Sequence, residues 1–288
     1  MTLARTVTTP AAEKHGVSGP CAGMGTPGQP VCLYLAKGQN TCAPPKLAID
    51  PDPAMNSLAL TADEQRNIEH GAWFARLSST LQQAILSRAL VRRLADGAPL
   101  AARGSQAQEW CGVARGAVRI SSVSLSGKQV SLTYAEPGTW FGDIALFDGL
   151  PRTHDADAHG DTTLLVVRKP DFHELLAQHV ELYDALLRLN CRRLRLMFDH
   201  FEDLNTRPLQ ARLAKQILLL ARGYGIAQGD EIRIGLQLAQ EDLAQLLGAS
   251  RQRVNQELKG FEREGVVRVE SARLVVLSRD KLMALAEK

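Results

Sequence analysis

The chain has 288 residues, of which 45% are hydrophobic and 23% are charged, and its formal net charge is +3. This length allows two ordinary domains with buried cores, and the composition is that of a globular protein. No stretch approaches the ~18 uncharged apolar residues of a membrane span, and the opening MTLARTVTTP has no apolar segment of the kind found in secretory signals, so we expect a cytoplasmic protein without a membrane partner.

The distribution of charges and cysteines favours a polyanionic partner and argues against disulfides and a metal site. From Asn205 to Lys288 there are 14 Lys and Arg against 10 Asp and Glu, so this part is modestly basic and suits a polyanionic partner. An odd number of cysteines argues against a disulfide framework, and none of them form the tight C-x₂-C pair of most zinc or iron–sulfur sites. We therefore expect no metal. The cysteines are Cys21, Cys32, Cys42, Cys111 and Cys191.

Residues 1–57 differ in composition from the rest of the chain. The first 53 residues hold eight of the thirteen prolines and six glycines, without a sustained hydrophobic period. Such a composition predicts a disordered or loosely ordered arm, because it offers too little apolar surface to bury.

Residues 58–170 are predicted to form a helical segment followed by a β-roll. Ser78 or Ser79 caps a helix in the stretch that ends at Val91. Alternation of apolar and polar residues at 118–121 and 129–134, with turn signals about every ten residues, is typical of a small antiparallel barrel or roll. The turn signals are Asp96-Gly97, Arg103-Gly104, Arg115-Gly116, Ser126-Gly127, Pro137-Gly138, Asp148-Gly149 and His159-Gly160.

The segment FGDIALFDGLPRTHDA, residues 141–156, lies between late strands of this roll. An arginine with small neighbours suits a phosphate, and Asp143, nine residues before Arg152, can accept from a sugar hydroxyl. The alternative is a surface turn with a solvated arginine. His154, beside the loop, is interpreted as a surface residue.

The stretch from about Pro170 to Arg207 is predicted to form one long helix that ends before Pro208. Apolar residues alternate at spacings of four and three, which is the seam of a coiled coil and predicts pairing with a second copy. The alternative is a helix packed on its own roll. Asn190 on this seam would fix the register of the pair. The seam residues are Tyr183, Leu187, Asn190, Leu194, Met197, Phe201 and Leu204.

The segment LAQEDLAQLLGASRQRVNQELKGFEREGVVRV predicts a helix-turn-helix. Gly248 ends the first helix, Ser250 caps the second, and the apolar runs 266–269 and 274–277 predict a β-hairpin wing. The second helix of such a motif enters the DNA major groove, where its N-terminal polar residues meet base edges; the alternative is a solvated helix face. The candidate DNA-binding residues are Ser250, Arg251, Gln252, Arg253, Asn255, Gln256 and Lys259.

These parts, in this order, resemble the cyclic AMP receptor protein/FNR (CRP/FNR) superfamily of bacterial transcription regulators. The resemblance covers about residues 58–285 and includes the loop FGDIALFDGLPRT. It implies an α+β fold in which residues 58–170 form a cyclic-nucleotide-binding β-roll, a double-stranded β-helix or jelly roll. Residues 171–207 would then be the dimerisation helix and 208–288 a winged helix-turn-helix. An effector in the roll would re-orient the two DNA-binding domains.

The resemblance also implies the effector contacts in the loop. In relatives that bind cyclic AMP, an acid after Phe-Gly takes the ribose hydroxyl, whereas an arginine and the following hydroxyl take the cyclic phosphate. Here aspartate stands in place of the glutamate, which shortens the sugar contact by one methylene. The matching residues are Gly142, Asp143, Ile144, Arg152 and Thr153.

The base contact departs from those relatives. Met197 and Phe198 stand where a Thr-Ser pair bonds adenine, and neither replaces those hydroxyls. Arg188, Arg192, Arg193 and Arg195 on the same helix can meet further phosphates or guanine edges, unless they form the solvated face of a coiled coil. Some family members respond to cyclic di-GMP, so the expected effector is cyclic di-GMP, with cyclic AMP as the second candidate. Arg192 and Arg195 complete the candidate effector residues.

The sequence thus predicts a homodimeric transcription regulator and not an enzyme, because it has no G-x-x-x-x-G-K-[ST] or H-E-x-x-H motif. The expected partners are double-stranded DNA, a second copy of the chain and RNA polymerase. By the resemblance, Arg251, Gln252 and Gln256 match residues that contact a GTGA-type half-site. Two alternatives stay open. One is a redox sensor that uses the N-terminal cysteines with Cys111, and the other is an effector-independent member of the family.

Overall fold

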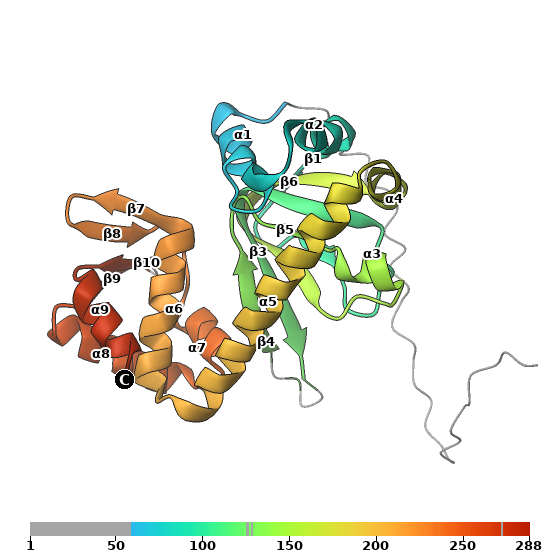
Figure 1. The fold of residues 1–288 in the computed structure, drawn as a ribbon. Helices are drawn as coiled ribbons and strands as arrows, with labels where there is room; N and C mark the ends of the chain where they lie inside the picture. The colour runs from blue at the N-terminus through green and yellow to red at the C-terminus, as the bar shows by residue number, and fades with distance from the viewer. Residues whose placement is uncertain (1–58, 125–126, 128, 272) are drawn as a thin grey trace, which may run out of the picture. The chain divides into compact units, whose positions relative to one another are not determined.

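The computed structural model describes residues 59–124, 127, 129–271 and 273–288 (Figure 1). The predicted arm, and with it Cys21, Cys32 and Cys42, lies outside the described residues, so these predictions stay untested. In the part that is described, no helix is both long and apolar enough to cross a membrane.

The roll is an antiparallel six-stranded sheet in which β3 and β6 pair from Glu109↔Arg168 to Ser121↔Asp155. Its path runs β1-β6-β3-β4, with β2 paired to β6 and β5 paired to β3. Together with the C-terminal helix-turn-helix described below, it confirms the predicted mixed fold. The strands are β1 Leu90–Leu94, β2 Pro99–Ala101, β3 Glu109–Val123, β4 Gln129–Ala135, β5 Trp140–Phe141 and β6 Asp155–Arg168.

Two of the predicted turns are wrong, because Gly116 lies inside β3 and Gly160 lies inside β6. The register of the β3–β6 pair shifts between Arg115 and Ala117. Gly116 has a φ of +76°, and a Cβ there would lie 2.6 Å from the carbonyl oxygen of Asp161. Glycine at such a position marks a β-bulge, which the sequence cannot distinguish from a turn.

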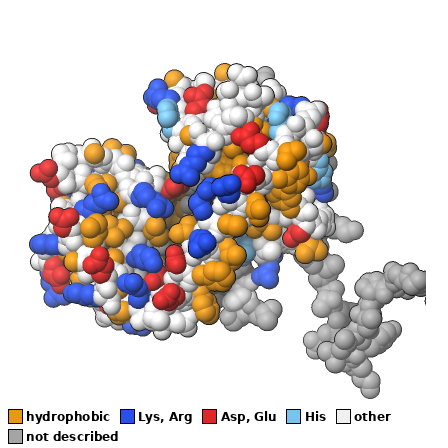
Figure 2. Space-filling view, in the orientation of Figure 1, with side chains coloured by type: hydrophobic (Ala, Val, Ile, Leu, Met, Phe, Trp, Pro, Cys, Tyr) orange, Lys and Arg blue, Asp and Glu red, His pale blue; other side chains and the backbone are white. Residues whose placement is uncertain are grey.

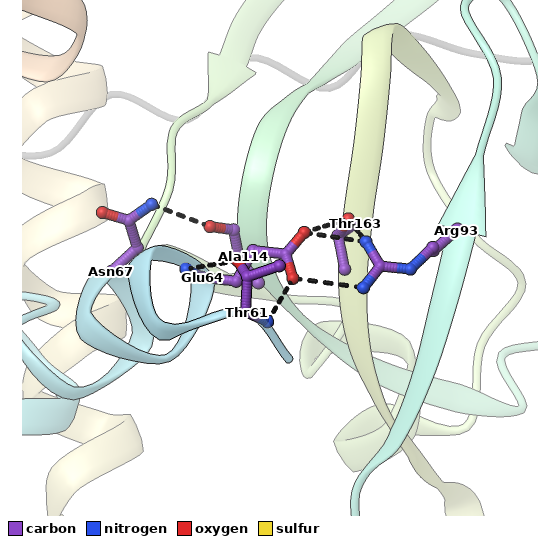
Figure 3. A network of polar contacts seen from close by, with 6 residues as sticks. All are labelled: Thr61, Glu64, Asn67, Arg93, Ala114 and Thr163. Carbon is purple, nitrogen blue, oxygen red and sulfur yellow. Dashed lines mark hydrogen bonds and ion pairs between the residues drawn. The ribbon is translucent and has the colours of Figure 1, made fainter. Parts of the chain in front are cut away.

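Helix α1 (Ala62–Glu69) is fastened to the roll through the buried carboxylate of Glu64 (Figure 3). Glu64 accepts from Arg93 Nη1 at 2.8 Å, from Thr163 Oγ1 at 2.7 Å and from the backbone N–H of Thr61 at 2.8 Å. Burial would raise the pKa of Glu64, but these hydrogen bonds outweigh it and lower the pKa to about 2. The ionised carboxylate therefore joins α1 to β1 and β6.

Three tryptophans, which are all that the chain contains, share one core cluster of the roll. The rings of Trp110 and Trp140 have centroids 4.3 Å apart, and Trp73 meets Trp110 edge-on at 5.7 Å. The short helix η1 (Phe74–Arg76) adds Phe74 to the cluster, and α2 (Ser79–Arg88) begins at the predicted cap Ser78. Tryptophan fluorescence therefore reports on this core and on Trp140, which stands beside the candidate effector loop.

The predicted long helix is in fact two helices, α4 (Lys169–Gln178) and α5 (Val180–Thr206). They are separated at His179, whose backbone leaves the helical region with φ −129° and ψ 88°, and α5 takes a different direction (Figure 1). Its large apolar residues, Phe172, Leu175 and Leu176, pack into the roll core. No Gly or Pro marks the break, so the sequence gives no signal for it.

The end of α5 is held by a buried acid. Asp203 forms an ion pair with Arg207, Nε to Oδ1 at 2.9 Å, and accepts from Lys215 Nζ; Arg207 also donates to the carbonyl of Ala286. Arg207 has the extended backbone expected before Pro208, as predicted.

The C-terminal part contains the predicted helix-turn-helix, formed by α7 and α8, and the predicted wing, formed by β9 and β10. A second hairpin, β7–β8, extends the wing into a four-stranded sheet with the order β7-β8-β10-β9. Neither this hairpin nor the last helix, α9, was predicted from the sequence. The elements are α6 Leu209–Tyr224, β7 Gly225–Gln228, β8 Glu231–Ile234, α7 Gln240–Leu247, α8 Arg251–Arg263, β9 Val267–Glu270, β10 Arg273–Val276 and α9 Arg279–Ala286.

Candidate effector site and nucleic-acid interface

The candidate effector loop, residues 141–156, contains a short helix that was not predicted from the sequence, α3 (Ile144–Asp148). The carbonyl of Asp143 accepts from the N–H groups of Leu146 and Phe147 at 3.1 and 3.0 Å. Gly149, with a φ of +69°, ends the helix in a left-handed conformation suited to glycine. The loop is therefore an ordered turn that fixes the position of Asp143.

Asp143 points inward and is completely buried. It accepts from Asn190 Nδ2 at 2.8 Å and from Arg193 Nη1 at 3.0 Å, and Arg193 also donates to the carbonyl of Trp140. Both partners lie on α5. A buried carboxylate needs such a charged, hydrogen-bonded partner because it has lost its water. The loop and α5 are thus joined through the acid that the sequence assigned to a sugar hydroxyl.

Arg193 is the arginine of α5 that reaches the loop. It is one of the four arginines considered from the sequence, but Arg192 and Arg195 were preferred as candidate effector residues. Arg188 instead pairs with Asp184 at 2.8 Å on the exposed side of the helix. Arg192 and Arg195 are exposed, and within the described residues no hydrogen bond or ion pair joins either to the loop. Their role in effector binding stays a prediction.

A signal for Arg193 was present in the sequence. Leu182 and Leu186 are fully buried against the roll, and Leu189 packs beside them. Arg193 continues this series at spacings of four, three and four, which keep residues on one face of a helix. The face of α5 that covers the roll therefore ends in Arg193.

Arg152 lies beside Gly142 and donates from Nη2 to the carbonyl of Glu109 at 3.4 Å. Gly142 has a φ of +95°, and a Cβ there would lie 3.0 Å from that carbonyl and 3.6 Å from Arg152 Nη1. Glycine suits this position because of its positive φ and because a Cβ would crowd the carbonyl of Glu109. Since a guanidinium has five N–H donors, one long hydrogen bond leaves Arg152 able to bind an anion.

The backbone around Arg152 is held by the turn at residues 102–105. Arg152 N donates to the carbonyl of Ser105 at 2.8 Å, and Gly104 N donates to the carbonyl of Arg152 at 2.8 Å. Thr153 is exposed, and its Oγ1 lies 2.8 Å from Nδ1 of the half-buried His154. Ile144 is exposed on α3. The structure thus places Arg152 beside Gly142, with Thr153 next to it in the chain, and their role in binding a phosphate stays a prediction.

The outer side of α5 carries an exposed apolar row. Figure 2 shows apolar side chains gathered over this helix, interspersed with basic ones. Asn190 is the exception among the seam residues because its amide is turned to Asp143. The apolar residues, between 43 and 69% exposed, are Tyr183, Leu187, Leu194, Met197, Phe198, Phe201 and Leu204.

Helix α8 presents polar side chains to solvent over a buried apolar side, which is formed by Val254, Leu258 and Phe261. Ser250 Oγ accepts from the N–H of Arg253 at 3.3 Å and caps the helix, as predicted. Asn255 is half-buried, and its Oδ1 accepts from Gln240 Nε2 of α7 at 3.0 Å. The exposed candidates are Ser250, Arg251, Gln252, Arg253, Gln256 and Lys259.

The two cysteines in the described part are free thiols in different surroundings. Cys191 is exposed on α5, whereas Cys111 is buried in β3. Burial, with a smaller effect from Glu109, raises the pKa of Cys111 to about 12, so this thiol is protonated at neutral pH. Within the described residues, no three His, Cys, Asp or Glu side chains are grouped to hold a metal ion.

Known proteins share both halves of this arrangement. Residues 91–179 match the family model for the cyclic nucleotide-binding domain, and residues 211–285 match the Crp-like helix-turn-helix domain. The chain is 32% identical to the CRP-like cAMP-activated global transcriptional regulator of Mycobacterium tuberculosis, over 58% of this chain and 75% of that protein.

Two solved structures share the fold at lower identity. FixK2 from Bradyrhizobium japonicum matches with a TM-score of 0.62 at 20% identity, covering 68% of this chain and 96% of that one. The c-di-GMP responsive global regulator CLP of Xanthomonas campestris matches with a TM-score of 0.60 at 17% identity, covering 70% of this chain and 100% of that one.

Proposed function

The chain belongs to the CRP/FNR superfamily of transcription regulators, and from this premise we propose that it is a homodimer that binds a specific DNA sequence under the control of a cyclic nucleotide in its roll. The observation that carries the proposal is the hydrogen-bonded link from Asp143 in the effector loop to Asn190 and Arg193 on α5. Through this link, an effector that contacts Asp143 would change the hydrogen bonds of α5, the helix that would connect the two copies.

The effector competes for groups that the chain already uses. Its phosphate binds Arg152 and the hydroxyl of Thr153, both at the mouth of the loop. Because Asp143 is completely buried between Asn190 and Arg193, a sugar hydroxyl that donates to it has to displace Asn190 or loosen Arg193. The effector thereby shifts the equilibrium between two arrangements of α5, as differential binding requires.

The second copy covers the exposed apolar row of α5. An apolar row along a surface helix marks an interaction surface, and its alternating spacing suits an identical helix. Asn190 belongs to this seam by spacing but donates to Asp143. It becomes available to fix the register of the pair only when the effector takes its place.

Cyclic di-GMP is the preferred effector, with cyclic AMP second. Met197 and Phe198 are exposed and apolar, so they supply no hydroxyl for adenine. Arg192 and Arg195 stand exposed on the same helix and can bind a second phosphate or a guanine edge. Related proteins are named for each effector: the M. tuberculosis regulator for cAMP and CLP for c-di-GMP.

The DNA contacts come from α8, with residues 208–288 as the DNA-binding domain and 58–170 as the roll. Of the predicted dimerisation segment, 171–207, helix α5 is the part that pairs, since α4 packs into the roll core. Ser250, Arg251, Gln252, Arg253, Asn255, Gln256 and Lys259 face two half-sites about 34 Å apart. RNA polymerase is the further partner of such a regulator. We assign no catalytic activity to the chain.

Calorimetry of the full chain with cyclic AMP, cyclic GMP and cyclic di-GMP, paired with DNA affinity measured with and without each, tests the proposal. Binding of one nucleotide together with a changed DNA affinity supports it. Tight DNA binding with no response to any of the three favours the effector-independent alternative. Iron and sulfide found after anaerobic purification would favour the redox alternative, to which the buried, protonated Cys111 is poorly suited.

A further inference from the structure

The proposed phosphate site has an imidazole at its edge. His154 follows Arg152 and Thr153 directly, and its Nδ1 lies 2.8 Å from Thr153 Oγ1. The turn at residues 102–105 holds this segment, because Asp155 Oδ1 accepts from the N–H of Arg103 at 2.8 Å. His154 is half-buried in this place and not a freely solvated surface residue.

We propose that His154 is a third phosphate-recognising side chain of the loop, and that it takes up one proton from solvent when the phosphate binds. This inference rests on the proposed function, because it requires a phosphate at Arg152 and Thr153. The ligand class is a cyclic nucleotide phosphodiester.

The hydrogen bond between Thr153 and His154 explains how protonation of the imidazole would change phosphate binding. A neutral imidazole whose Nδ1 accepts from the hydroxyl of Thr153 leaves that hydroxyl no proton to offer a phosphate. A protonated imidazole donates from both ring nitrogens. Its Nδ1–H then donates to Thr153 Oγ1, and the hydroxyl of Thr153 turns to donate to a phosphate oxygen. Protonation therefore adds a positive charge and a donor at once.

The charged groups around His154 set the direction of the effect. Burial lowers the pKa of His154, the guanidinium of Arg103 lowers it further, and Asp155 opposes them. Arg152, two residues before it, adds positive charge on the same segment. The imidazole is therefore neutral at neutral pH in the free protein, and a phosphate anion raises its pKa in the complex.

The pH dependence follows from this direction. A group whose pKa rises on binding contributes affinity that is fully present below its free-state pKa and is lost as pH increases through its bound-state pKa. Effector affinity should therefore fall between pH 6 and pH 8, by at most about tenfold per pH unit for a single proton.

Calorimetry of the full chain with cyclic di-GMP, cyclic AMP and cyclic GMP at pH 6 and pH 8, in two buffers of different ionisation enthalpy, tests the inference. We expect wild type to take up a proton with the nucleotide it binds, and to bind it more tightly at pH 6. His154→Asn should remove both effects, whereas His70→Asn, at the exposed histidine that follows the last residue of α1, should retain both.

The outcomes separate the two proposals. Wild-type binding with no proton uptake and equal affinity at both pH values overturns the inference alone, even if His154→Asn fails to fold. Proton uptake that persists in a folded His154→Asn variant also overturns it. No binding of any of the three nucleotides by wild type overturns the cyclic-nucleotide part of the proposed function and the inference with it.

Discussion

The effector loop and the recognition helix α8 differ in how far their polar side chains are already used inside the chain. In the loop, Asp143 is buried between Asn190 and Arg193, and Arg152 donates to a backbone carbonyl. On α8, most of the candidate side chains are exposed, although Asn255 bonds to Gln240 of the neighbouring helix. The effector loop must exchange existing contacts in order to bind its ligand, whereas α8 has mainly to order its side chains in order to bind DNA.

This difference has an energetic consequence. Breaking a buried ion pair by removing one partner costs about 3–5 kcal/mol, so a ligand that reaches Asp143 must replace the lost hydrogen bonds. An exposed side chain that binds DNA loses only rotamer freedom, roughly 0.5–1.5 kcal/mol for each one immobilised. A site that must exchange buried contacts is suited to a switch, whereas a preformed surface is suited to reading a sequence.

The largest expected effect removes the link between the two sites. Leu194→Glu combined with Phe201→Glu places charges in the exposed apolar row of α5 and should give a monomer. Two linked half-site contacts exceed a single one by about 10²–10⁴ in affinity, so binding to a palindromic duplex should fall by that order. Sedimentation and fluorescence anisotropy measure the two properties.

A matched control lies on the same helix. Leu196 is 57% exposed but lies outside the seam, so Leu196→Glu should leave both the dimer and DNA binding intact. A monomeric double variant that binds the duplex at full affinity would contradict the assigned interface.

The next effect isolates the effector loop. Arg152→Ala removes the guanidinium proposed to bind the phosphate, and hydrogen bonds to charged groups are worth about 1.5–3 kcal/mol each. Calorimetric affinity for the nucleotide should fall by about 100-fold or more, with effector-free DNA binding unchanged. As a control, Arg115→Ala, at an exposed arginine of β3, should leave the affinity for the nucleotide unaltered. Equal affinity for wild type and Arg152→Ala would place the effector elsewhere.

Local patterns predicted much of this architecture because the signals are local. Residues that are neighbours in the sequence determine the cap at Ser250, the left-handed conformation of Gly248 and the alternation in β3 and β4. The break at His179 and the bulge at Gly116 were missed, because each depends on packing between distant segments. The short helix α3 was also missed because its five residues give too brief a period to detect.

The candidate site was predicted in composition but not in connectivity. Asp143 and Arg152 were selected from the loop, whereas Asn190 and Arg193 lie 47 and 50 residues from Asp143 in sequence. Four arginines lie close together on α5, and residue type alone does not show which of them reaches the loop. The sequence does place Arg193 on the same helix face as Leu182 and Leu186, but only the structure shows that this face, and not the seam, packs against the roll.

The third effect tests whether the contacts of the loop are as costly to break as its burial indicates. Arg193→Met leaves the buried carboxylate of Asp143 with Asn190 alone, and should lower the free energy of unfolding by about 3 kcal/mol. Asp143→Asn in the same chain removes the stranded charge and should recover part of that loss. Urea unfolding followed by tryptophan fluorescence measures both, since the indole of Trp140 is buried in the roll core and its backbone carbonyl accepts from Arg193. Additive losses in the double variant would mean that the two side chains do not interact.

The smallest expected effect concerns one base pair. Arg251 keeps the planar fork that bonds guanine O6 and N7, whereas the amides of Gln252 and Gln256 suit adenine. The preferred half-site should therefore keep one guanine and differ from GTGA beside it. Arg251→Ala should cost about 1–3 kcal/mol and relax specificity at that base pair, whereas Lys259→Ala, if it loses a phosphate contact, should weaken all sequences alike. Selection from random duplexes distinguishes them: recovery of an unmodified GTGA palindrome as the best site would show that the two glutamines do not set the sequence.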